Sequence, residues 1–143
     1  MKKRYITIFL FILLVVSFLV YHLYPRDMKD IVIEDRTIID SIKVYSFDTV
    51  ACEAKLITLV NSDLTSFLAL LQETEAHLKI AKEEYFESAR YYRIFIHEAG
   101  IGTRSSLCDI EYYADENVLT VNGVQYVILN PMFHDQFLMI LEH

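Results

Sequence analysis

The chain has 143 residues, which predicts one domain, and 54% of them are hydrophobic, above the roughly 45–50% of a soluble globular chain. Three glycines and two prolines exclude collagen-like and proline-rich proteins, and two cysteines are too few for a disulfide scaffold. The formal net charge of −7 argues against a nucleic-acid partner, because such a partner requires a basic patch.

The excess of hydrophobic residues is concentrated near the N-terminus. Residues 5–24 contain no Lys, Arg, Asp or Glu, and tyrosines stand at both ends of the stretch. A helix of this length rises about 30 Å at ~1.5 Å per residue, which matches the hydrocarbon core of a bilayer. The sequence therefore predicts a transmembrane helix that contacts the lipid bilayer through residues 5–24, with Pro25 as its stop.

A cleaved signal peptide is the first alternative to a permanent anchor. It requires small residues before the cut, whereas residues 20–24 are mostly large. A bacterial lipoprotein would carry a cysteine directly after the apolar run, but the first cysteine is Cys52. We expect an uncleaved signal anchor, and the sequence leaves open whether it is ever removed.

The basic residues predict the orientation of this anchor. Residues 2–4 are all basic, whereas the basic residues after the stretch are mixed with acidic ones. The positive-inside rule then places the N-terminus in the cytoplasm and the C-terminal domain outside. We expect three parts: a basic start and anchor (1–25), a juxtamembrane linker (26–36) and an extracytoplasmic domain (37–143).

The charge of the part beyond the anchor is strongly negative. Three of the 13 Lys and Arg residues precede the apolar stretch, so residues 26–143 carry the other ten against all 20 Asp and Glu, a formal charge of −10. Such a domain is repelled by an anionic membrane and attracted to cations or a basic partner, although solubility alone also explains the charge.

Strands are predicted directly after the linker. Residues 38–47 alternate loosely between apolar and polar, and residues 54–60 are rich in β-branched and apolar side chains. A turn is expected between them at Asp48-Thr49.

The hydrophobic period then changes to that of a helix. Residues 63–72 carry Leu and Phe at helical spacing, and Asn61 or Ser62 can cap the helix. A second set of apolar residues follows in phase. One helix over residues 63–88 and two helices with a break near residues 73–77 are both compatible with this pattern.

The last third of the chain predicts an antiparallel meander and a final helix. Asn122-Gly123 is the strongest hairpin signal, because a type I′ turn needs positive φ at both residues. Asn130-Pro131 begins a helix, with an apolar stripe formed by Phe133, Phe137, Ile140 and Leu141. The strands of the meander are expected at residues 91–97, 107–114, 118–121 and 124–129.

These elements together predict the fold class α+β. The expected order after the transmembrane helix is β-β-α-β-β-β-β-α, an antiparallel sheet with helices packed on one face.

The two cysteines allow two interpretations. A disulfide between Cys52 and Cys108 fits an oxidising exterior, and two separate free thiols are the alternative. Their spacing in the sequence does not decide whether their Cα atoms approach to about 6 Å.

Catalytic chemistry has one candidate cluster. His97-Glu98 precedes Cys108-Asp109, which is a conceivable nucleophile with a base and an acid. Alternation, however, places Cys108 on the apolar face of its strand and His97 on the face opposite to Ile96, together with Arg93 and Phe95. We therefore expect no catalytic, cofactor-binding or metal-binding residues and no cofactor, and we expect that the protein is not an enzyme.

Tyrosines gather in the predicted sheet, and they belong to both of its faces. One face must pack on the helices, whereas the other is able to expose Tyr113 with Phe95, or Tyr91, as an interaction surface. Cross-strand pairing that only stabilises the sheet is the alternative.

The order of these patterns resembles that of small Gram-positive envelope proteins with one anchor and a short extracytoplasmic domain of the YhfM-like or DUF5301 type. The resemblance covers about residues 36–141 and rests on structural motifs, namely residues 42–45, 64–71, 92–96 and 118–126. Lipoprotein members carry a cysteine after the apolar run, which this chain lacks. The resemblance implies no catalytic residues.

Three functional hypotheses follow. The first is a single-pass, membrane-anchored protein-binding or accessory module at the cell envelope, and its oligomeric state and partner stay open. The second is an immunity-type inhibitor that blocks a toxin or an enzyme at the membrane, which a strongly basic partner would favour. The third is a small envelope enzyme, which requires His97, Glu98 and Asp109 to converge.

Overall fold

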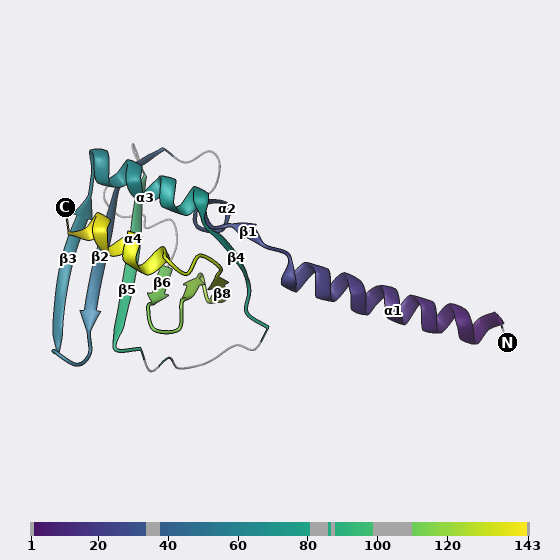
Figure 1. Cartoon of the computed structure of the whole chain (residues 1–143). Coiled ribbons are helices and arrows are strands. Elements are labelled where there is room, and N and C mark those ends of the chain that lie inside the picture. Colours follow the sequence, from purple (N-terminus) through teal and green to yellow (C-terminus); the bar gives the residue numbers. More distant parts are fainter. Residues whose placement is uncertain (1, 34–37, 81–85, 87, 99–109, 143) are drawn as a thin grey trace.

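The computed structural model describes residues 2–33, 38–80, 86, 88–98 and 110–142. It confirms the α+β class: a long N-terminal helix leads into a domain in which the described residues form an eight-stranded antiparallel sheet (Figure 1). The helices are α1 (Lys2–Leu23), α2 (Met28–Val32), α3 (Asn61–Glu73) and α4 (Phe133–Leu141). The strands are β1 (Arg26–Asp27), β2 (Ile39–Asp48), β3 (Glu53–Leu59), β4 (Glu75–Leu78), β5 (Arg90–Glu98), β6 (Ile110–Tyr113), β7 (Val118–Val121) and β8 (Val124–Ile128).

The helix α1 is long and apolar enough to cross a membrane. Its span Tyr5–Leu23 comprises 19 residues, and none of that span is buried against the rest of the chain. In Figure 1 the helix extends away from the domain, on the side opposite to β3. This arrangement is compatible with a membrane anchor.

The sheet contains the predicted meander. Its strand order is β1-β4-β8-β7-β6-β5-β2-β3, so β5, β6, β7 and β8 are consecutive neighbours. The turn between β7 and β8 is Asn122-Gly123, with φ values of 49° and 80°. The predicted hairpin is therefore confirmed, and Gly123 is needed because side-chain-bearing residues rarely adopt such a φ.

The segment expected to be a linker is partly folded into the domain. Arg26 and Asp27 pair with β4 as β1, and the Met28 amide donates a 2.8 Å hydrogen bond to the Thr74 carbonyl. The side chains of Met28, Val32 and Ile33 are buried in the core. The sequence pattern did not predict this burial, because charged residues surround these apolar positions. Residues 34–37 of the expected linker lie outside the described residues.

The chain between residues 61 and 78 decides between the two helical interpretations. The helix α3 ends at Glu73, Thr74 is extended with a φ of −111°, and β4 follows. A continuous helix over residues 63–88 is therefore wrong. The reason is tertiary, because β4 fills the place between β1 and β8 in the sheet.

The N-caps of α3 and α4 are not the residues that the sequence predicted. The N-cap of α3 is Val60, without a side-chain cap, so the prediction of Asn61 or Ser62 there is wrong. Before α4, the Asn130 carboxamide accepts a 2.9 Å hydrogen bond from the Met132 amide. This bond closes a turn before α4, but the N-cap of α4 is Met132, without a side-chain cap, so the prediction that Asn130 caps this helix is wrong.

The core lies between the sheet and the pair α3 and α4. Phe137 of α4 contacts Phe67 of α3 at 5.6 Å between ring centroids, and it contacts Tyr92 and Tyr112 of the sheet at 5.2 and 5.7 Å. All four side chains are buried. Phe137 thus joins both helices to the sheet.

We predict that Phe137→Ala costs about 3–5 kcal/mol of unfolding free energy, because it removes a buried ring from a packed core. Denaturant unfolding of the full chain in detergent micelles measures this cost. The matched control is Met139→Ala on the same helix, where the side chain is 60% exposed and the expected change is within about 0.5 kcal/mol. Equal effects of the two substitutions would contradict this description of the core.

The partly buried His134 makes the stability of the core depend on pH. Its ring lies 6.1 Å from the Tyr92 ring and 6.0 Å from the Tyr112 ring. Burial lowers the pKa of His134 below its ordinary value of 6.5, although the neighbouring Asp135 acts in the opposite direction. The unfolded chain therefore takes up this proton at a higher pH than the folded chain does.

We predict that the stabilising effect of neutral His134 is complete above about pH 6.5 and is lost as the pH falls below that value. Thermal unfolding of the full chain in detergent at about pH 7.5 and about pH 5 measures it. The fall in Tm on acidification should be smaller in His134→Gln than in the unaltered chain. A fall of the same size in both proteins would show that His134 is not responsible.

Candidate functional site

Side chains alternate between the two faces of the sheet, and only one face carries α3 and α4 (Figure 1). On the helix-covered face, β5 contributes Tyr92, Ile94 and Ile96, as the sequence predicted. The opposite face of β2 and β5 is set by the register, which pairs Lys43 with Phe95, Tyr45 with Arg93 and Phe47 with Tyr91.

Aromatic rings form a continuous row on this opposite face. The centroid distances are 5.5 Å between Phe95 and Tyr45, 6.5 Å between Tyr45 and Phe47, 4.7 Å between Phe47 and Tyr91, and 6.0 Å between Tyr91 and Tyr113. All five side chains are partly exposed. Pairs of this kind stabilise a sheet by about 0.5–1.5 kcal/mol beyond their burial, so the row has a structural role as well.

A shallow groove of about 340 Å³ lies over this face between β2 and β5. We call it the sheet groove. Its size falls at the lower end of the roughly 300–1,000 Å³ found for small-ligand sites. The described residues that line it are Lys43, Tyr45, Phe47, Arg93, Phe95 and His97.

Beside the sheet groove, the carboxylate of Glu111 is bound by Arg93 and Tyr113. Arg93 Nε lies 3.4 Å from Glu111 Oε1, and the Tyr113 hydroxyl donates a 2.8 Å hydrogen bond to Glu111 Oε2. Burial and this hydrogen bond both raise the pKa of Tyr113, so the phenol keeps its proton at neutral pH. The Arg93 guanidinium carbon lies 5.8 Å from the centre of the Phe95 ring.

Two further polar side chains in the groove lack a partner among the residues that the structure describes. Nε2 of His97 is shielded from solvent and has no hydrogen-bond partner in this part of the chain. Such a buried, unpaired polar atom costs about 1–3 kcal/mol. Lys43 is partly exposed and forms no ion pair with a described residue.

The cluster proposed for catalysis is only partly described. His97 and Glu98 are consecutive in β5 and so point to opposite faces of the sheet, and these two do not converge. Cys108 and Asp109 lie outside the described residues. Cys52 is an exposed free thiol in the turn between β2 and β3.

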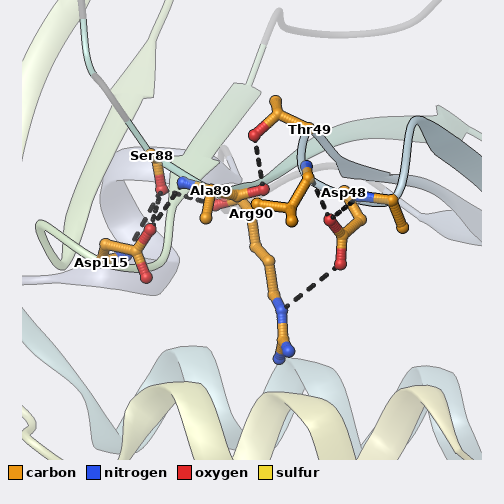
Figure 2. A network of polar contacts seen from close by, with 8 residues as sticks. Asp48, Thr49, Ser88, Ala89, Arg90 and Asp115 are labelled. Atoms are coloured by element: carbon orange, nitrogen blue, oxygen red, sulfur yellow. Dashed lines mark hydrogen bonds and ion pairs between the residues drawn. The ribbon is translucent and has the colours of Figure 1, made fainter.

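A polar network at one end of the sheet connects three turns (Figure 2). The Ala89 amide donates a 2.7 Å hydrogen bond to Asp115 Oδ2, and the Ala89 carbonyl accepts from the Thr49 amide at 2.9 Å and from the Thr49 hydroxyl at 3.0 Å. Ser88 Oγ lies 3.1 Å from Asp115 Oδ2, and Asp48 Oδ1 accepts from the amides of its own turn.

The partners in this network are mainly backbone groups, which indicates a structural role. Arg90 Nε lies 3.8 Å from Asp48 Oδ2, and both side chains are substantially exposed, so this ion pair adds at most about 1 kcal/mol. The network holds the entry to β5 against the β2–β3 turn and the β6–β7 turn.

A second cavity, of about 540 Å³, lies where α1 joins the domain, and it contains Asp27, Asp30 and Glu75. Among the residues that the structure describes, no group of three His, Cys, Asp or Glu side chains is placed to hold a metal ion. The sheet groove is therefore the stronger candidate for an interaction site.

The sequence indicated part of the sheet groove. Alternation along the strand places His97 on the same face as Arg93 and Phe95. The same pattern predicts Tyr91 and Tyr113 as candidate surface residues. It did not single out Lys43 or Phe47, because the loose alternation of residues 38–47 does not show which strand lies beside them. Only the pairing of β2 with β5 brings these side chains together.

Comparisons with protein-family models, curated proteins and solved structures find no match to this chain.

Proposed function

We propose that the chain is a single-pass, membrane-anchored protein whose extracytoplasmic domain binds another protein at the cell envelope through the sheet groove. The observation that carries this proposal is a groove of aromatic and cationic side chains on the sheet face opposite α3 and α4. The resemblance to anchored envelope modules of the YhfM-like or DUF5301 type belongs to the same proposal.

The composition of the groove supports protein binding. Tyr, Phe and Arg are enriched at the centres of protein interfaces, where they combine a large contact area with few rotatable bonds. The groove contains Tyr45, Phe47, Phe95 and Arg93. A binding role is favoured over catalysis because the neighbours His97 and Glu98 point to opposite faces of β5.

The connection to α1 supports a role at the membrane. Only Tyr24 and Pro25 separate α1 from β1, and β1 is part of the sheet. The Arg26 guanidinium carbon lies 4.9 Å from the centre of the Tyr21 ring, across this junction. A partner bound in the groove would therefore be tethered to the membrane through this short connection.

The exposed Cys52 provides a test of sidedness. We predict that a membrane-impermeant maleimide labels Cys52 on intact cells that express the full chain with Cys108→Ala. The matched control carries Lys3→Cys with both natural cysteines replaced by Ala, and it should be labelled only after permeabilisation. The reverse pattern of labelling would place the domain in the cytoplasm and overturn the proposal.

Site-specific photo-crosslinking tests the groove itself. We predict that benzoylphenylalanine at position 45 of the full chain forms a discrete adduct with another protein in intact cells, because Tyr45 lines the groove. The same probe at position 139, on the exposed side of α4, is the control and should not form this adduct. Equal adducts at both positions, or none at positions 45, 47 and 95, would contradict binding through the groove.

A further inference from the structure

The charge of the sheet groove is opposite to that of the domain. Residues 26–143 carry the ten basic and 20 acidic residues that remain beyond the anchor, a formal charge of −10. The described lining of the groove, however, contains the cations Lys43 and Arg93 and no carboxylate, and Glu111, the ion-pair partner of Arg93, lies beside this lining. From this contrast, we infer that the groove binds an extended protein segment in which every second residue faces the groove, and these facing residues are acidic and large apolar in turn. This inference rests on the proposed function and specifies the chemistry of the partner.

Nitrogen-bearing side chains and aromatic rings alternate along the groove. Along β5, Arg93 and His97 lie on either side of Phe95, and along β2, Lys43 is followed on the same face by Tyr45. Residues two apart on a strand are separated by about 6.8 Å. On one face of an extended guest segment, side chains recur at the same interval of about 6.8 Å. Carboxylates and apolar side chains that alternate on this face therefore meet Lys43 or Arg93 and the aromatic rings in turn.

The domain itself contains an example of this recognition. Glu111 lies on the same face, its carboxylate is held between Arg93 and the Tyr113 hydroxyl, and aromatic rings surround the pair. Close by, Lys43 has no ion-pair partner among the described residues. Its ammonium group offers a positive charge to a guest carboxylate.

The position of the groove favours a protein over a lipid headgroup. Five strand spacings of ~4.8 Å separate β1 from β5, so the groove lies about 24 Å along the sheet from the strand that follows α1. In Figure 1, β2 and β5 lie on the side of the domain away from α1. The headgroup layer of a bilayer adds only about 5–8 Å on each side.

The test uses the full chain in nanodiscs of phosphatidylcholine and short fluorescent peptides. With Thr at every intervening position, one peptide carries Asp and Phe in turn at every second residue, a second carries Lys and Phe, and a third carries Asp and Ser. We expect fluorescence anisotropy to show binding of the Asp–Phe peptide and much weaker binding of the other two. Lys43→Glu should weaken the binding of the Asp–Phe peptide by about fivefold or more and improve the binding of the Lys–Phe peptide.

The matched control is Lys55→Glu, which makes the same charge change at an exposed position of β3 outside the groove. It should leave the affinity within about twofold, because solvent and salt screen a charge at that distance. Thermal unfolding verifies that both variants keep their fold. A second variant, Tyr45→Ser, should reduce binding of the Asp–Phe peptide through loss of apolar contact.

Four results would overturn the inference: no binding of the Asp–Phe peptide, equal effects of Lys43→Glu and Lys55→Glu, equal binding of the Asp–Ser peptide, or self-association of the chain that Lys43→Glu abolishes. Lys43-dependent attachment of the domain to vesicles of anionic lipid would do the same. If adducts still form at position 45 in cells, the proposed function stands and only the chemistry of the partner is wrong. If adducts are also absent, both proposals fail.

Discussion

The antiparallel pairing of β2 with β5 is the constraint on which the rest of the domain depends. Its register places Val44 beside Ile94 on one face and Tyr45 beside Arg93 on the other. The first face is sealed by α3 and α4 and forms the core, whereas the second contains the aromatic row and the sheet groove. Because side chains alternate strictly along a strand, a shift of one residue would exchange these two faces and destroy both.

The junction between α1 and the sheet makes the anchor and the domain one continuous structure. The Met28 side chain is buried, and its amide is bonded to the Thr74 carbonyl directly after β1. The first two strands of the sheet order, β1 and β4, are short, and they lie at the edge nearest to α1. The longer strands β2 and β5, which carry the groove, lie further from α1 in the sheet order. This separation keeps the candidate binding surface away from α1.

The tyrosines of the sheet show how one residue type serves two purposes. Tyr92 and Tyr112 stack on each other at 5.8 Å under Phe137, and both are buried. Tyr91 and Tyr113 pair in the same two strands, but on the groove side, where they are partly exposed. Adjacent residues with the same side chain thus contribute to the core and to the surface. Cross-strand pairing of the rings is confirmed, and an interaction surface at Tyr91 and Tyr113 stays a prediction.

The sequence by itself determined the features that depend on local patterns. These are the apolar helix over residues 5–24, the meander with its Asn122-Gly123 turn, and the apolar stripe of the last helix, because periodicity and turn chemistry are properties of neighbouring residues. Only the tertiary structure decided that residues 26–33 enter the core, that residues 75–78 form a strand, and that Lys43 lies beside Phe95. Each of these depends on pairing between segments far apart in the chain, and such pairing leaves no periodic signal in either segment alone.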